Sequence, residues 1–99
     1  MRKLSDVMGR AIGQREILRG ARAQVVMRRW PEVVGPILAQ HSSAERYERG
    51  ALWVRASGSA WAQELRLQQD VIVARLNELG GEDLFQSLRV GVRAARQDS

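Results

Sequence analysis

Apolar residues recur at steps of three and four along the first 41 residues, which is the spacing of one helix face. The first stripe predicts a short amphipathic helix that ends near Gly13; its members are Leu4, Val7, Met8, Ala11 and Ile12. A second helical stretch starts around Arg15 and runs to residue 41. Pro31 and Pro36 interrupt it, because proline lacks a backbone N–H and crowds the carbonyl four residues before it. We therefore expect a kink, or a break into two helices, near Trp30.

The middle of the chain has the pattern of a β-hairpin. A short strand is expected near Arg46–Glu48, a turn at Arg49–Gly50 and a second strand over Ala51–Ala56. Side chains of a strand alternate between its two faces. One face of the second strand therefore carries Leu52, Val54 and Ala56, and the other carries Trp53 and Arg55.

A long helix is expected next, with Ser59 as its N-cap and Gly80–Gly81 as its C-cap. Its apolar stripe consists of Trp61, Leu65, Ile72, Leu76 and Leu79. The following segment alternates again, with Leu88, Val90 and Val92 on one face and Arg89 and Arg93 on the other. The sequence thus predicts an α+β domain made of two N-terminal helical segments, a β-hairpin, a long helix and a third strand. Helices are expected to cover one face of the three-stranded sheet.

The composition narrows the class of protein. A length of 99 residues fits one domain, which we assign to residues 1–93, with a disordered tail expected over residues 94–99. The chain has no cysteine and one histidine, which excludes disulfides, thiolate metal sites and multi-histidine metal centres. It has no apolar run near the roughly 20 residues of a membrane span and no signal peptide pattern. We expect a soluble, cytoplasmic protein without cofactor or membrane partner.

The net charge of +5 is unevenly distributed. Residues 1–31 carry eight basic and two acidic side chains, whereas residues 56–88 carry two basic and five acidic ones. This polarity suits a protein with one basic surface for a polyanion and another surface for a protein partner. A merely solvated arginine-rich surface explains it equally well. The residues expected to bind nucleic acid are Arg22, Arg28, Arg29, Trp53, Arg55, Arg89 and Arg93, of which the last four share the sheet face that the helices leave open.

Catalytic chemistry finds little support. Ser57 and Ser59 lack the Gly-x-Ser-x-Gly pattern of a nucleophile elbow, and their segment lacks the lysine and spacing of a phosphate-binding loop. Glu64 and Asp70 are six residues apart on a helix and do not share a face. A structural or partner-contact role is favoured for His41. We therefore predict that the protein is not an enzyme and has no small-molecule substrate.

Three segments carry a family pattern: WPEVVGPILAQHS (30–42), GALWVRASGSAWAQELR (50–66) and VIVARLNELGGEDLFQSLRV (71–90). Together they resemble the DciA family, whose bacterial members assist loading of the replicative helicase DnaB. The matching positions are Trp30, Val33, Val34, Gly35, His41, Ser42, Leu52, Val54, Ser59, Trp61, Ala62, Glu64 and Leu65. The match covers roughly residues 20–92. It implies a KH-like fold, binding of single-stranded DNA, a helicase partner and no ATPase activity.

The sequence departs from the expected pattern in three respects. Ala44 stands where a proline commonly follows the His-Ser pair. The Gly-x-x-Gly loop with which typical KH domains clamp a nucleic-acid backbone is absent, so that binding mode is not carried over. Many relatives also have a long extension beyond this domain, whereas this sequence ends at Ser99.

The resulting hypothesis is a non-enzymatic replication factor that binds single-stranded DNA and DnaB and promotes helicase loading. Trp30 and His41 are the expected helicase contacts, although a tryptophan on an apolar stripe is more often part of the core. Trp61, Leu65 and Ser59 are expected to be structural. Two other classes remain open: a stand-alone RNA-binding KH-like module, and a structural adaptor whose basic surface is incidental.

Overall fold

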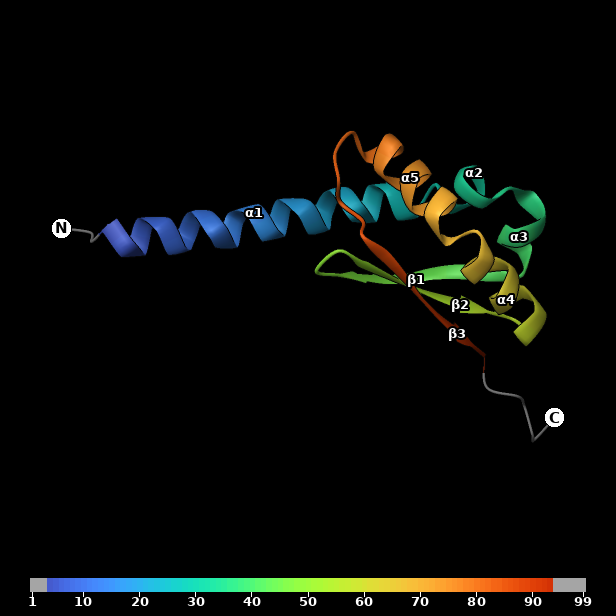
Figure 1. The fold of residues 1–99 in the computed structure, drawn as a ribbon. Helices are drawn as coiled ribbons and strands as arrows, with labels where there is room; N and C mark the ends of the chain where they lie inside the picture. The colour runs from blue at the N-terminus through green and yellow to red at the C-terminus, as the bar shows by residue number, and fades with distance from the viewer. Residues whose placement is uncertain (1–3, 94–99) are drawn as a thin grey trace.

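The computed structural model describes residues 4–93, with side chains from Arg15 onward, as five helices and three strands (Figure 1). In chain order they are α1 (Leu4–Met27), α2 (Trp30–Val34), α3 (Pro36–Gln40), β1 (Ser42–Glu48), β2 (Ala51–Ala56), α4 (Ser59–Leu67), α5 (Gln69–Gly80) and β3 (Ser87–Val92). The helices lie on one side of the sheet, and α1 projects beyond it toward the N-terminus. This is the predicted α+β architecture. The tail expected over residues 94–99 lies outside the described residues.

The helix α1 is continuous, so the predicted end near Gly13 is wrong. A glycine inside a helix costs about 1 kcal/mol relative to alanine, but it keeps its N–H, and the helix therefore passes through Gly13 and Gly20.

The predicted break near Trp30 is confirmed. The helix α1 ends at Met27, and α2 begins at Trp30 with Pro31 in its first turn. A second break follows at Gly35, whose φ of +92° lies in a region open mainly to glycine. The first N–H groups of a helix have no partner within the helix, so a proline there removes no hydrogen bond. Pro36 therefore begins α3 without losing one.

The sheet has the strand order β1-β2-β3, with β1 antiparallel and β3 parallel to β2. Parallel neighbours need a crossover connection, which α4 and α5 provide. The turn predicted between β1 and β2 is confirmed: Arg49 and Gly50 both have positive φ, as the two central residues of a type I′ turn require. The strand β2 has its predicted bounds, whereas β1 starts four residues earlier than expected, at Ser42.

The long helix predicted after residue 58 is divided at Gln68 into α4 and α5. The assignment of Ser59 as N-cap is wrong. Gly58, in an extended conformation, is the N-cap, because the N–H of Ala62 already donates to the Gly58 carbonyl at 3.0 Å. The predicted C-cap is confirmed, since Gly81 adopts the left-handed conformation with φ of +77°.

The core lies between the helices and one face of the sheet. Leu52, Val54 and Ala56, predicted to face inward, are at most 3% exposed. They pack against a cluster that includes Val26, Trp30, Leu65, Ile72, Leu76, Leu84 and Phe85. Helices on one face leave the opposite face of the sheet open to solvent. No helix in the described part of the chain is long and apolar enough to cross a membrane.

Candidate nucleic-acid interface

A β-bulge in β1 shapes the open face of the sheet. The register pairs Ala44 with Val54 and Arg46 with Trp53, so Glu45 is an extra residue without a partner. Ala44 and Tyr47, three residues apart instead of two, therefore both pack against the core. The bulge turns both Glu45 and Arg46 toward the open face.

Tyr47 gives the reason for this irregularity. Its hydroxyl donates to the carbonyl of Leu84 at 2.8 Å, and its ring meets Phe85 edge-on at 5.2 Å between centroids. A regular strand that kept Ala44 inward would point Tyr47 away from both partners. Arg46 was not among the site residues expected from the sequence, although the three-residue spacing of Ala44 and Tyr47 was the available signal.

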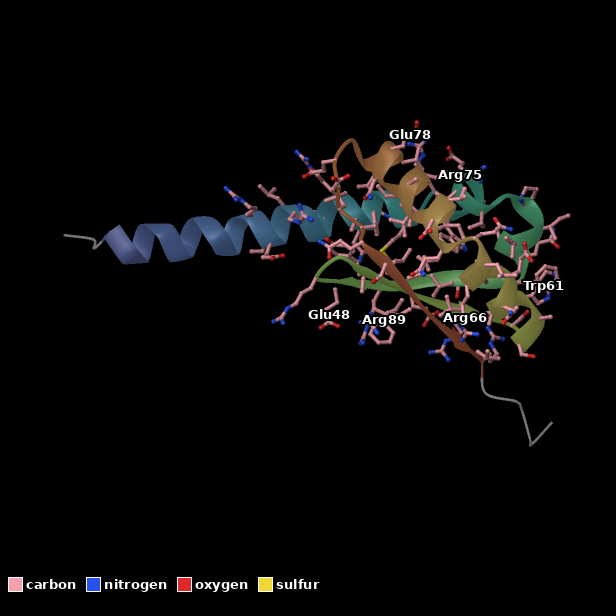
Figure 2. The ribbon with its side chains drawn as sticks, in the orientation of Figure 1. Glu48, Trp61, Arg66, Arg75, Glu78 and Arg89 are labelled. Atoms are coloured by element: carbon pink, nitrogen blue, oxygen red, sulfur yellow. The ribbon has the colours of Figure 1, made fainter. Side chains whose placement is uncertain are left out.

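Trp53 is the centre of the open face. The residue is 38% exposed. The guanidinium carbon of Arg46 lies 4.6 Å from the ring centroid and that of Arg89 lies 6.0 Å away, within cation–π range. Both arginines stand beside Trp53 across the sheet, one on each neighbouring strand. Figure 2 shows Arg89 below the sheet, on the side opposite Arg75 and Glu78 of α5.

A shallow cavity of about 670 Å³ follows this surface. Its lining includes Glu45, Arg46, Trp53, Arg55, Arg89 and Gly91. We use the name open face for these six residues together with Arg93, which alternation along the chain places on the same side.

Carboxylates moderate the charge of this surface. Arg55 donates from Nε to Oε1 of Glu45 at 3.3 Å, and Arg46 lies 3.6 Å from Glu48. All four side chains are at least 41% exposed, and exposed pairs of this kind contribute about 0–1 kcal/mol. A phosphate can therefore replace such a carboxylate at little cost. Arg89 has no carboxylate within ion-pair distance among the described side chains.

The three arginines of the N-terminal half that were expected to bind nucleic acid lie in or next to helices α1 and α2, in what we call the helical layer. Arg22 of α1 forms an ion pair with Glu82 in the loop after α5. Arg29 donates two hydrogen bonds to Glu32, at 3.0 and 2.7 Å, and these bonds hold the pKa of the Glu32 carboxyl below its usual range. Arg28 is exposed near the end of α1. The structure thus joins Trp53, Arg55, Arg89 and Arg93 on one face but does not bring Arg22, Arg28 and Arg29 to it.

The two tryptophans of the helices occupy different environments. Trp30, expected at a partner surface, is 4% exposed and part of the core, where its Nε1 donates to Ser42 Oγ at 3.0 Å. Trp61, expected to be structural, is only partly buried. Its ring stacks on His41 with centroids 4.1 Å apart and planes 5° from parallel. Leu65, on the next turn of α4, is fully buried as expected.

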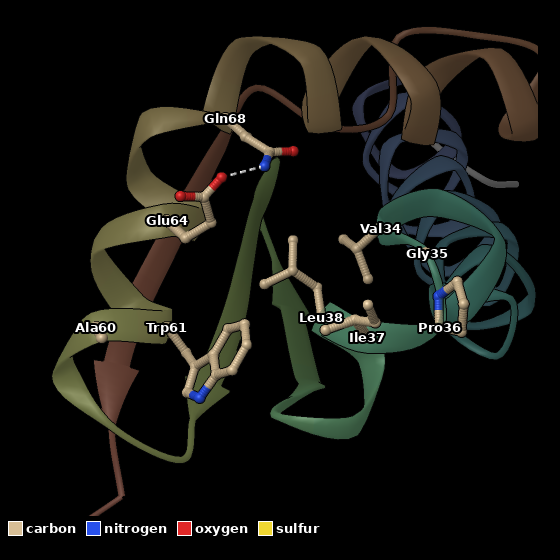
Figure 3. A pocket seen from close by; sticks show the side chains of 9 residues that line it. All are labelled: Val34, Gly35, Pro36, Ile37, Leu38, Ala60, Trp61, Glu64 and Gln68. Carbon is tan, nitrogen blue, oxygen red and sulfur yellow. Dashed lines mark hydrogen bonds between the residues drawn. The ribbon is translucent and has the colours of Figure 1, made fainter.

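Trp61 lines a second cavity, an apolar groove of about 500 Å³ between α4 and the α2–α3 segment (Figure 3). We call it the α3–α4 groove; its lining consists of Val34, Gly35, Pro36, Ile37, Leu38, Ala60, Trp61, Glu64 and Gln68. Ile37 is 65% exposed at its edge. Glu64 accepts a hydrogen bond from Gln68 at 2.5 Å and is the one charged group of this lining.

His41 has no arrangement for nucleophilic catalysis. Its Nδ1 lies 3.4 Å from Ser57 Oγ, at the limit of a hydrogen bond, and its ring face is covered by Trp61. Neither neighbour is a carboxylate that could orient the ring as a general base requires. Among the side chains that the structure describes, from Arg15 to Arg93, no three acidic or histidine groups are placed together as metal ligands.

Comparison with known proteins identifies the family. The family model described as "Dna[CI] antecedent, DciA" matches residues 3–90, nearly the whole chain. The chain belongs to the DciA family. The resemblance found in the three sequence segments is thereby confirmed.

Curated relatives in this family carry the name UPF0232. The protein of Streptomyces coelicolor is 39% identical over 89 residues, which are 88% of this chain and 47% of that protein. The protein of Streptomyces avermitilis is 43% identical over 67 residues, 66% of this chain and 37% of its own length. The protein of Mycobacterium tuberculosis is 34% identical over 71 residues, 72% of this chain and 38% of its own length. The chain spans less than half the length of these relatives.

Proposed function

We propose that this DciA family member is a non-enzymatic replication factor that binds single-stranded DNA through its open face and the replicative helicase DnaB through its α3–α4 groove, and so promotes helicase loading. The observation that carries the DNA part is the cluster of Arg46, Trp53 and Arg89 across three adjacent strands. Family membership supports the helicase part.

The open face has the two components of a single-strand site. Guanidinium groups bind phosphates without regard to sequence, and an exposed indole stacks on a base that is free of a duplex partner. The solvent exposure of Trp53 and Arg89 means that neither has to leave the core to make such contacts. A duplex offers its bases only at the groove edges, so stacking on Trp53 favours a single strand.

The DNA part is tested by two charge-matched double variants. Arg55→Gln with Arg89→Gln removes two cations from the open face. Arg15→Gln with Arg28→Gln, called the α1 pair, removes one exposed cation from α1 and one directly after its last residue. The logarithm of the binding constant falls linearly with the logarithm of the salt concentration, and we call the steepness of this line the salt slope. Each lost phosphate contact lowers the salt slope of single-strand binding by about 0.7. The open-face pair is expected to weaken binding of a fluorescent oligonucleotide roughly tenfold at low salt and to lower the slope by about 1.4.

The α1 pair serves as the control and is expected to change affinity by less than about twofold, the general effect of net charge. Equal losses for both pairs would show diffuse electrostatic binding and contradict the open-face site. Competition with RNA of the same sequence completes the test, because a strong preference for RNA supports the RNA-binding alternative instead.

The helicase part is tested by placing a charge in the groove. Ile37→Glu adds a carboxylate at the edge of the α3–α4 groove, and Leu67→Glu adds one at an equally exposed leucine of α4 outside the groove lining. Purified DnaB is expected to be retained by the wild-type chain and by the Leu67 variant but lost by the Ile37 variant. Retention by all three contradicts the groove as the docking site.

Loading itself requires no nucleotide site in this mechanism. A protein that binds one state of a helicase ring more tightly than another shifts the ring toward that state by the difference in binding free energy. Helicase-dependent unwinding of a forked DNA substrate, measured with and without the protein, is expected to rise when it is present. If DnaB is retained but unwinding does not change, the protein is an adaptor that binds the helicase without promoting its loading.

A further inference from the structure

We propose that the open face contains a nucleobase site selective for guanine. In this site Trp53 stacks on the base, Gly91 leaves room for it, and Glu45 accepts hydrogen bonds from the N–H groups along its edge. This inference rests on the proposed binding of single-stranded DNA by the open face. It adds what charge and stacking alone do not supply, a preference among bases.

Gly91 provides the space. It stands directly opposite Arg55 in the register of β2 and β3, on the outward side of the sheet. A Cβ atom at this position would meet no other atom within 4 Å, so the surface above Gly91 is open. Glycine weakens a strand and often marks a place where a ligand approaches the backbone. Gly91, Trp53 and Arg89 together line the cavity of about 670 Å³, which has the size of a small-molecule site.

Trp53 supplies the stacking surface next to this space. The guanidinium of Arg46 is in contact with its ring, whereas that of Arg89 lies farther away, at 6.0 Å. Arg89 belongs to β3, the strand that contains Gly91, so a base that approaches Trp53 from β3 meets the more distant of the two guanidinium groups.

Glu45 supplies the selection. It accepts one bond from Arg55 at Oε1 and one from Ser43 Oγ, 3.1 Å away, at Oε2. A carboxylate has about four acceptor positions, so each oxygen retains a free one. Glu45 lies in the same cavity lining as Trp53 and Gly91, because the bulge in β1 turns it to this face.

Guanine matches this arrangement better than the other bases. Its N1–H and N2–H are two adjacent donors that suit the two oxygens of a carboxylate, and its O6 and N7 are acceptors for an arginine such as Arg89. Thymine offers one donor between two carbonyl oxygens, which a carboxylate repels. Adenine and cytosine each offer one exocyclic amine beside a ring acceptor. A good bidentate contact discriminates by about tenfold against a base that cannot form it.

The experiment measures binding of the full chain to twelve-residue deoxythymidine oligonucleotides with one central substitution, by fluorescence anisotropy at low salt. A single guanine excludes quadruplex formation. The guanine oligonucleotide is expected to bind about tenfold more tightly than all-thymine, with hypoxanthine, which lacks the N2 amine, in between. Adenine and cytosine are expected to remain within about threefold of thymine.

Two variants separate the parts of the site. Glu45→Gln removes a negative charge, so affinity for all oligonucleotides is expected to rise while the preference for guanine falls toward one. Gly91→Val fills the space, and is expected to abolish the preference with the salt slope unchanged. Its melting temperature is expected to be no lower than that of the wild type, because valine suits a strand and meets no neighbour here.

Each outcome decides between the claims. Salt-dependent binding of all oligonucleotides with equal affinity overturns the guanine site and leaves the open face as a DNA-binding surface. Absence of binding to any of them overturns the proposed function itself. A guanine preference that persists in the Glu45 variant removes Glu45 from the site, and one that persists in Gly91→Val places the base elsewhere.

Discussion

Replacement of Trp30 by alanine is expected to destabilise the fold by about 3–5 kcal/mol, the usual cost of removing a large aromatic side chain from a core. Trp30 is 4% exposed and lies beside Val33 and Leu38, which are 1% and 7% exposed. The total stability of a domain this size is about 5–15 kcal/mol. The variant therefore loses between about a fifth and all of its free energy of unfolding, and loss of function in it reports unfolding.

A second component of this cost is polar. Trp30 Nε1 donates to Ser42 Oγ at 3.0 Å, and Ser42 Oγ donates to the carbonyl of Leu38 at 2.7 Å. Phenylalanine at position 30 retains most of the bulk but lacks the donor, so Trp30→Phe is expected to cost about 1–2 kcal/mol. This variant remains folded, which makes it the informative one for function.

Urea unfolding followed by far-ultraviolet circular dichroism measures both variants without using tryptophan fluorescence, which the substitutions themselves alter. Retention of DnaB by the phenylalanine variant is expected, since the α3–α4 groove is lined by Trp61 and not by Trp30. A loss of less than about 1 kcal/mol in Trp30→Ala would refute its assignment to the core. A folded Trp30→Phe variant that fails to retain DnaB would instead make Trp30 a contact residue.

The same unfolding assay checks three local predictions. Asn77 both donates to and accepts from the backbone of Phe85, at 2.8 and 2.7 Å, so Asn77→Ala is expected to cost about 2–3 kcal/mol; a loss below about 0.5 kcal/mol contradicts this role. Ser59→Ala is expected to change stability by less than about 0.5 kcal/mol, because Gly58 is the cap. A loss near 1 kcal/mol would restore Ser59 as the cap. Gly81→Ala forces a Cβ into the left-handed region and is expected to cost about 1–2 kcal/mol, whereas no loss would show that the C-cap adapts.

The two helical tryptophans show that an apolar stripe does not by itself predict how deeply each of its residues is buried. Trp30 and Trp61 both occupy apolar stripes, and the sequence led us to expect Trp30 at a partner surface and Trp61 in a structural role. In the fold, Trp30 lies in the core between the helices and the sheet, where Ser42 accepts its N–H. Trp61 lies at the start of α4 with His41 against its ring. The difference arises because the two helices approach the sheet at different places, which is a property of the packed domain.

Four local features of the backbone could be predicted from the sequence alone. The break before Pro31, the turn at Arg49–Gly50, the left-handed cap at Gly81 and the inward alternation of β2 were all predicted and are all present. Each depends on the φ angles that a residue permits or on the two-residue period of a strand. Such constraints act within a few residues of the chain, so no distant contact is needed to establish them.

The composition of the open face was decided by tertiary structure. The bulge that exposes Arg46 exists because Tyr47 packs on Phe85, 38 residues later in the chain, and bonds to Leu84. The ion pair of Arg22 with Glu82 also joins distant segments, and it keeps that arginine in the helical layer. The sequence by itself determined the tight turn, the left-handed C-cap, the bounds of β2 and which residues are basic. Only the packing of those elements determined which arginines meet around Trp53, because that depends on register and on contacts between parts of the chain far apart in sequence.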